Sequence, residues 1–217
     1  MKLNTLFVHL FFQKKDEECT ILNSEPALVC VDHSGRYELL SEVETLSNVS
    51  VLMAKGIWND QDFIILRDKF RATLPSCVAN VVLREVDMGD IKLDPSCDFI
   101  DLRGLFNFCV NLTRVILPDA TLFEGKVCFH STFRGCSKLR DLYNLATYRR
   151  ISDLRGTFCY CTALSSLELY AEPFPQGDSE TFRKVNRNIR ITVPPDTRVS
   201  SDWSQLTLEN IIFKDRL

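Results

Sequence analysis

Nine cysteines and three histidines are the residues through which this chain could support nucleophilic catalysis or bind a metal. The cysteine count is odd, which disfavours a framework of paired disulfides, and no Cys-x-x-Cys motif occurs. The closest candidate zinc ligands are the pairs Cys128/His130 and Cys159/Cys161. Structural zinc sites separate such ligands by two to four residues, whereas a single residue separates each pair here. We therefore expect the chain to use no metal and no cofactor.

The histidines give little support to an enzyme. A cysteine nucleophile needs a neighbouring base such as histidine, and His130 is the histidine next to a cysteine of the repeated region. Because His130 follows the apolar Phe129, its own side chain should point outward. The chain also lacks the His-Glu-x-x-His, Gly-x-Ser-x-Gly and glycine-rich phosphate-binding motifs. We therefore expect no catalytic residues and no enzymatic activity.

The elements that carry these residues are set by an internal repeat, apolar-x-x-x-Phe-x-x-Cys-x-x-Leu-x-x-apolar. Strong copies of this frame occupy residues 102–118, 129–142 and 154–169, and their phenylalanines, Phe106, Phe133 and Phe158, are 27 and 25 residues apart. A weaker copy begins at Phe182 and has Asn188 in the leucine position. The ending of the frame also occurs at residues 83–88 and 46–51. Most of these intervals fall in or near the range of leucine-rich repeats, about 20–29 residues.

The alternating residues at the end of the frame predict one short strand in each repeat. In the copy at residues 102–118, Val115 and Leu117 should point into a core while Arg114 and Ile116 point outward. One such strand cannot bury its apolar face alone, so successive strands should stack. The sequence therefore predicts a leucine-rich repeat solenoid. This is a right-handed superhelix of short parallel strands, mostly β with one inserted helix and capped at both ends.

The cysteines of the frame, Cys109, Cys136 and Cys161, should stack as small buried apolar residues. The alternative is oxidation, because neighbouring coils about 4.8 Å apart would bring two thiols within reach of a disulfide.

The boundaries follow from interruptions of the repeat. Asn59 followed by acidic residues and an apolar face predicts a helix at about residues 60–71. Residues 1–45 should form an N-terminal β-rich cap, with strands at 6–12, 20–22 and 27–31. The solenoid should then cover residues 46–194, and residues 195–217 should form a C-terminal cap in which Trp203 plugs the core.

These motifs resemble the BspA-type leucine-rich repeat of surface and secreted proteins found in Bacteroidetes. The resemblance rests on the Phe-x-x-Cys-x-x-Leu-x-x-Ile-x-Leu-Pro frame, on residues 49–68 as a strand and helix, and on the strand at 83–91. It covers about residues 46–203 and matches nothing in residues 1–45. The resemblance implies a binding role without catalysis, with adhesion to proteins or cells as the usual function.

A protein partner should contact the outward strand positions, because exposed arginine, tyrosine and isoleucine on a rigid scaffold are typical of interfaces. The candidate partner-binding strand face consists of Arg114, Ile116, Asp141, Tyr143, Glu168 and Arg190. The alternative is a solvated face without a partner.

A second hypothesis concerns charge. The whole chain carries a formal charge of −3, which makes nucleic acid an unlikely partner. Residues 134–190 nevertheless hold more basic than acidic side chains. An anionic partner could therefore bind the basic C-terminal half, and a solvated basic edge is the other interpretation. The candidate basic patch consists of Arg149, Arg150, Arg183, Lys184 and Arg187.

Residues 5–12 form the best apolar run, which is far shorter than a membrane-spanning helix and a poor secretory signal. We expect no membrane span and a monomer. The weak signal and unpaired cysteines favour the cytoplasm, whereas the resemblance favours the cell surface or secretion, so the compartment stays open.

Overall fold

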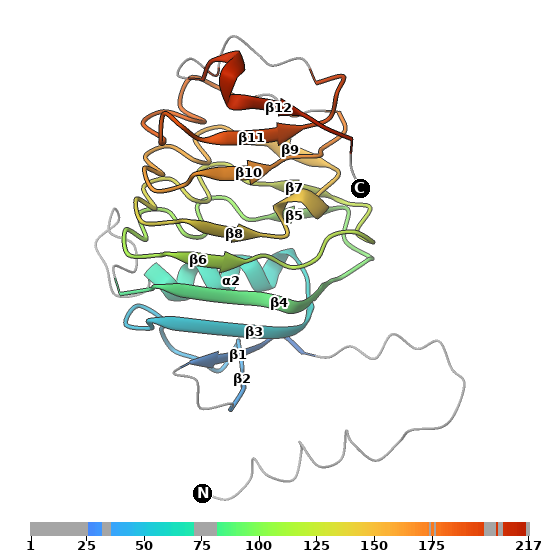
Figure 1. Ribbon diagram of the computed structural model, residues 1–217. Coiled ribbons are helices and arrows are strands. Elements are labelled where there is room, and N and C mark those ends of the chain that lie inside the picture. The colour runs from blue at the N-terminus through green and yellow to red at the C-terminus, as the bar shows by residue number, and fades with distance from the viewer. Residues whose placement is uncertain are drawn as a thin grey trace, which may run out of the picture.

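Short strands are the predominant regular secondary structure of the computed structural model, which describes residues 26–31, 36–71, 82–173, 175, 177–197, 203 and 206–215. The front sheet of Figure 1 has the strand order β2-β1-β3-β4-β6-β8. Its strands are β1 (Leu28–Val31), β2 (Glu38–Leu39), β3 (Val51–Trp58), β4 (Glu85–Leu93), β6 (Arg114–Ile116) and β8 (Asp141–Tyr143). From β3 onward the pairing is parallel, whereas β1 pairs with β2 and β3 in antiparallel fashion.

Two further parallel sheets complete the fold. The back sheet has the order β5-β7-β9, formed by β5 (Phe99–Asp101), β7 (Lys126–Cys128) and β9 (Ile151–Asp153). The upper sheet has the order β10-β11-β12, formed by β10 (Ser166–Glu168), β11 (Arg190–Val193) and β12 (Ile211–Phe213). The remaining elements are α2 (Asp60–Arg71), the 3₁₀ helix η1 (Leu145–Thr147) and the 3₁₀ helix η2 (Leu208–Asn210). The described chain is thus mostly β with parallel strands and one α-helix, and none of its sheets closes into a barrel.

From β4 to β9 the chain alternates between the front and back sheets (Figure 1), so that each circuit places one strand in each. Corresponding residues pair directly. Val86 lies opposite Val115 and Val115 opposite Leu142 in the front sheet. In the back sheet Ile100 lies opposite Val127, which lies opposite Ile151. Equivalent apolar residues of successive circuits therefore form one continuous core.

The repeated phenylalanines stack on one another inside this core. The ring centroids of Phe106 and Phe133 are 5.8 Å apart, those of Phe133 and Phe158 are 6.0 Å apart, and those of Phe158 and Phe182 are 5.5 Å apart. The interplanar angles are 18°, 12° and 14°. We call these four residues the phenylalanine column. Offset stacking at this separation is a favourable arrangement of aromatic rings.

Side-chain hydrogen bonds also link each circuit to the one before it. The Cys136 thiol donates to the carbonyl of Phe106 at 3.0 Å, and the Cys161 thiol donates to the carbonyl of Phe133 at 3.1 Å. No disulfide joins any two of the seven cysteines that the structure describes, so these circuits are not linked covalently through them. The frame cysteines instead serve as small buried donors, and they give a second hydrogen bond to carbonyls that also accept a backbone amide within their own turn.

Buried threonines directly before three of the column phenylalanines make equivalent bonds. The Thr132 hydroxyl donates to the carbonyl of Leu102 at 2.8 Å, and the Thr157 hydroxyl donates to the carbonyl of Phe129 at 2.7 Å. Thr181 donates to the carbonyl of Leu154 at 3.2 Å. These hydroxyls were not anticipated from the sequence, although a threonine directly before the phenylalanine in three copies was a visible signal.

The helix α2 covers the N-terminal end of the column. Asn59 and Asp62 form a reciprocal cap, since the Asp62 amide donates to Asn59 Oδ1 at 3.2 Å and the Asn59 amide donates to Asp62 Oδ2 at 2.9 Å. The buried helix residues include Phe63 and Phe70, and the ring centroid of Phe70 is 6.1 Å from that of Phe106. At the other end, the buried Trp203 lies edge-on against Phe182, with centroids 4.8 Å apart.

The structure corrects two details of the repeat. In the first copy, Leu52 rather than Val49 pairs with Val86, because the buried residues of β3 alternate from Leu52 to Trp58. In the last copy, Ile189 is buried and the predicted Asn188 is exposed, because an asparagine would lose its hydration in the core. The strand predicted at residues 27–31 is β1, and those predicted at 6–12 and 20–22 lie outside the described residues.

Candidate functional site

The outward side chains of β4, β6 and β8 form two parallel rows, which we call the strand face. Register pairing sets the rows as Glu85–Arg114–Asp141 and Asp87–Ile116–Tyr143. Arg114 and Asp141 are exposed, Tyr143 is 48% exposed and Ile116 is half-buried. The Arg114 guanidinium carbon lies 5.6 Å from the centroid of the Tyr143 ring, within the range of a cation–π contact. The strand face thus combines alternating charges with a tyrosine and an isoleucine.

A glycine opens space beside Ile116. A Cβ atom at Gly89 of β4 would lie 3.3 Å from Ile116 Cγ2 and 3.2 Å from Asp87 Oδ1. The Gly89 amide donates to Asp87 Oδ1 at 3.0 Å, which holds the Asp87 carboxylate in place. The neighbouring strand β3, which pairs with β4, has a bulge between Met53 and Lys55. The strand face is therefore a fixed surface, since its side chains stand on hydrogen-bonded strands over a packed core.

The predicted partner-binding residues divide between two sheets. Arg114, Ile116, Asp141 and Tyr143 are neighbours on the strand face. Glu168 and Arg190 are exposed on β10 and β11, which belong to the upper sheet and do not pair with β8. The structure thus brings the first four residues together and places the other two further along the stack (Figure 1).

The predicted basic patch is also divided. Arg149 and Arg150 lie between η1 and β9, and Arg150 donates to the Glu124 carbonyl at 2.8 Å. The other members lie in the turn between Phe182 and β11, where Arg183 forms an ion pair with Glu180 at 2.7 Å. Lys184 and Arg187 line a groove that contains neither Arg149 nor Arg150.

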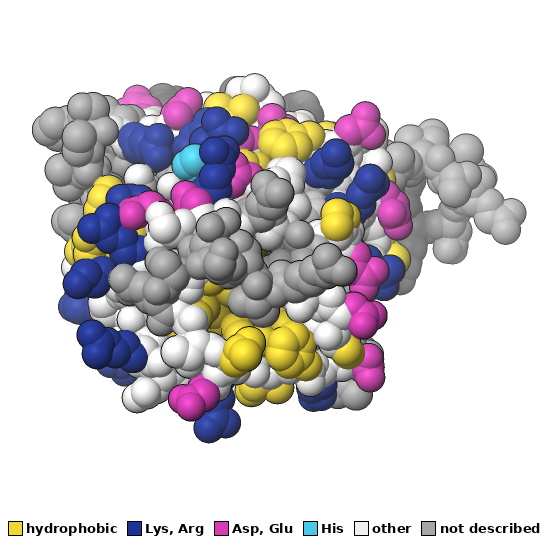
Figure 2. Space-filling model, turned by 90° about the horizontal axis from the view of Figure 1, so that it is seen from above, with side chains coloured by type: hydrophobic (Ala, Val, Ile, Leu, Met, Phe, Trp, Pro, Cys, Tyr) yellow, Lys and Arg dark blue, Asp and Glu magenta, His cyan; other side chains and the backbone are white. Residues whose placement is uncertain are grey.

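This groove, which we call the end groove, has a volume of about 960 Å³. The residues lining it are Tyr160, Thr162, Lys184, Val185, Arg187, Asn188, Ile189, Arg190, Thr207, Glu209 and Asn210. Figure 2 shows this end of the molecule, and Lys and Arg side chains gather along its left side. The turns that lead into the front strands lie on the same side in Figure 1. Tyr160 was not anticipated as a site residue from the sequence.

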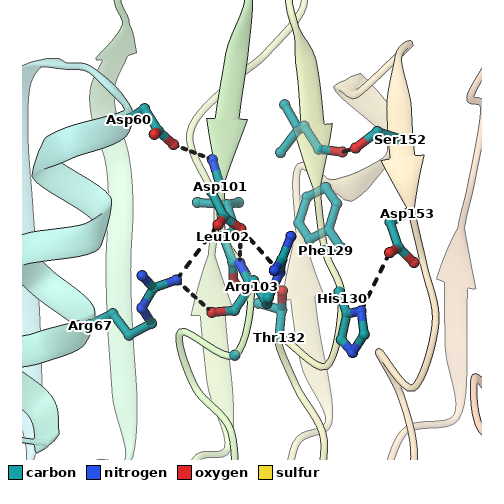
Figure 3. Close-up of polar contacts among 12 residues, drawn as sticks. Asp60, Arg67, Asp101, Leu102, Arg103, Phe129, His130, Thr132, Ser152 and Asp153 are labelled. Atoms are coloured by element: carbon teal, nitrogen blue, oxygen red, sulfur yellow. Dashed lines mark hydrogen bonds and ion pairs between the residues drawn. The ribbon is translucent and has the colours of Figure 1, made fainter.

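A charged cluster occupies the ends of the back strands (Figure 3). Asp101, Cys128 and Asp153 are register neighbours at the ends of β5, β7 and β9. His130 Nδ1 lies 3.3 Å from Asp153 Oδ2, and Arg155 lies 2.7 Å from the same oxygen. Burial alone would raise the pKa of Asp153, but hydrogen bonds and charge from Arg155 outweigh it and hold the pKa below its usual value.

Part of this cluster attaches α2 to the first back strand. Arg67 donates to the Arg103 carbonyl at 3.0 Å, and the Asp101 amide donates to an Asp60 carboxylate oxygen (Figure 3). Arg71 donates to the Gly104 carbonyl at 2.7 Å. These contacts attach α2 to the end of β5 and the turn that follows it. Asp60, Arg67 and Arg71 therefore have a structural role.

The thiols of Cys128, Cys136 and Cys161 are poorly suited to nucleophilic chemistry. Burial raises the pKa of the Cys128 thiol, although the backbone amide of His130 and the Arg103 side chain lower it in part. Burial also raises the pKa of Cys136 and of Cys161. His130 Nδ1 lies 3.3 Å from Asp153 Oδ2, so this ring nitrogen faces a carboxylate rather than a thiol. The described residues include no group of three or more His, Cys, Asp or Glu side chains that could hold a metal ion.

None of the helices in the described residues is sufficiently long and apolar to cross a membrane. Comparison of the chain with protein-family models, with curated proteins and with solved structures found no match.

Proposed function

We propose that the chain is a leucine-rich repeat solenoid of the BspA type, wound as a right-handed superhelix and capped at both ends. Its function in this proposal is to bind a protein partner without catalysis, with adhesion as the role that the resemblance favours. The observation that carries the proposal is the strand face, where Arg114, Ile116 and Tyr143 are presented on paired strands.

Several features support the repeat class. The column phenylalanines stack at 5.5–6.0 Å, and the frame cysteines bond to the preceding circuit through the same atoms in successive copies. A repeat of this kind exposes a long, regular row of strand positions, and such surfaces in repeat proteins suit extended macromolecular contacts.

The composition of the strand face supports a protein ligand. Arginine and tyrosine are enriched among the residues that contribute most of the binding free energy at interfaces. An apolar residue such as Ile116 adds apolar surface that is removed from water on binding. The alternating charges of Glu85, Arg114 and Asp141 would fix the orientation of a partner rather than supply most of the affinity.

The cysteines and His130, which are the residues that could do chemistry, support the noncatalytic part of the proposal. A reactive cysteine needs a lowered pKa, yet burial raises the pKa of Cys128, Cys136 and Cys161. His130, with Asp153 beside it, lies in a cluster of which another part holds α2 in place.

Quantitative affinity capture from the native host tests this proposal. The bait proteins are the wild type, Tyr143→Ala with Arg114→Glu, and a control that carries Lys126→Glu at an exposed position of the back sheet. We expect the same partner to be enriched by the wild type and the control and lost from the double variant. Equal recovery of that partner by the double variant, with its circular dichroism unchanged, would contradict the proposal.

A further inference from the structure

The end groove is built from three adjacent segments of chain that are fixed to each other. The Tyr160 amide donates to the Arg183 carbonyl at 2.7 Å, which joins the first two segments. The buried Asn210 side chain donates to the carbonyls of Arg187 and Ile189, each at 2.9 Å, which joins the third segment. A groove with such walls is preorganised, so a ligand would not have to order them on binding.

The groove carries a local excess of positive charge. Lys184, Arg187 and Arg190 line it together with one acidic residue, Glu209, although the whole chain has a net charge of −3. Arg187 and Arg190 are exposed, and neither side chain forms an ion pair with another described residue. Each of these two guanidinium groups can therefore donate two parallel N–H hydrogen bonds to one carboxylate.

Tyr160 adds an aromatic surface at a position where the backbone disfavours it. Tyr160 has φ 63°, in the left-handed region, and the residue is 39% exposed. The equivalent positions after Phe106, Phe133 and Phe182 are Phe108, Gly135 and Lys184, with φ 58°, 77° and 60°, so the left-handed turn recurs in all four copies and a glycine satisfies it. The Arg183 guanidinium lies 6.0 Å from the centroid of the Tyr160 ring and helps to hold it at the groove.

From this geometry we propose that the end groove binds an extended acidic segment of a protein. Carboxylates of the segment pair with Arg187 and Arg190, and an apolar side chain of the segment packs on Tyr160. A peptide that contains both acidic and aromatic residues therefore carries both chemistries. The site is separate from the strand face, and its occupation does not depend on a partner bound there.

A fluorescein-labelled peptide of alternating glutamate and phenylalanine, titrated with the full chain in a fluorescence anisotropy assay, tests the proposal. We expect saturable binding that weakens as salt rises. Arg187→Glu should weaken binding by about tenfold or more, because it removes one charged pair and adds repulsion. Tyr160→Gly should weaken binding severalfold without lowering the midpoint of thermal unfolding, since glycine accepts the left-handed backbone.

Two further proteins decide the interpretation. Arg149→Glu makes the same charge change at an exposed arginine outside the groove, and it should leave the dissociation constant unchanged. Tyr143→Ala, on the strand face, should also bind the peptide as the wild type does. A loss with Arg149→Glu equal to that with Arg187→Glu would mean general electrostatic attraction and would overturn the proposal. So would wild-type affinity in Tyr160→Gly, or no binding by the wild type at low salt.

Discussion

Replacing neighbouring rings of the phenylalanine column, singly and together, should reveal a coupling free energy between them. Phe133 and Phe158 have centroids 6.0 Å apart and an interplanar angle of 12°, and both are fully buried. Leucine preserves most of the apolar volume while removing the ring, so Phe133→Leu and Phe158→Leu should each lower the free energy of unfolding by about 1–3 kcal/mol.

The shared contact between these rings sets the size of the coupling. Each single variant loses the Phe133–Phe158 contact, which stabilises by about 0.5–1.5 kcal/mol beyond the area it buries. The double variant loses this contact only once. Its destabilisation should therefore be smaller than the sum of the single effects by about 0.5–1.5 kcal/mol.

Phe106 and Phe182 provide the matched control, because two rings of the column stand between them. Phe106→Leu and Phe182→Leu should add to within about 0.5 kcal/mol. Urea unfolding monitored by circular dichroism gives each of these free energies, provided that the slope of the free energy of unfolding against urea concentration is the same for each variant. Additive effects for Phe133 with Phe158, or equal coupling in both pairs, would refute the stacked arrangement.

Three further predictions address single groups. Thr157→Val should lower the free energy of unfolding by about 0.5–1.5 kcal/mol in urea titrations, because it removes the threonine donor from the Phe129 carbonyl, which keeps the Thr132 amide, and an unchanged value would contradict that role. The Asp153 pKa is lowered in the folded state, so its stabilisation should be present above the usual carboxyl pKa and lost as pH falls through the folded value. Asp153→Asn should thus be less stable than the wild type near neutral pH and approach it in acid, and a difference independent of pH would count against the assignment. In pulsed iodoacetamide labelling read by mass spectrometry, the half-buried Cys97 should react before the buried Cys136 in the native protein, and the reverse order would be inconsistent with the packing.

The parts of the fold that the sequence predicts are those with a repeated, strongly apolar signal. Phe106, Phe133 and Phe158 stack as their spacing predicts, and α2 spans Asp60–Arg71, the segment with the cap and the apolar face. Gly104 has φ 60°, in the left-handed region that glycine accepts without a steric penalty.

The back strands were not predicted, because each has three residues and only a short apolar signal. Ile100, Val127 and Ile151 are the inward residues of these strands, and one such residue gives no visible alternation. Their pairing depends on the stacking of whole circuits, which is a tertiary effect. For the same reason the sequence could group basic residues along the chain but could not indicate that Tyr160 and Arg187 would line the same groove.

The alignment of neighbouring circuits can be measured directly by disulfide trapping on the strand face. Arg114 and Asp141 are register partners, so their Cα atoms should be about 4.8 Å apart, within the range that a disulfide bridges. Tyr143 lies two residues further along its strand, so its Cα should be roughly 8 Å from that of Arg114. Under mild oxidation, peptide mapping should find a bridge in the Arg114→Cys/Asp141→Cys protein and none in the Arg114→Cys/Tyr143→Cys protein. A bridge in the second protein but not in the first would contradict the register on which the strand face and the proposed binding function depend.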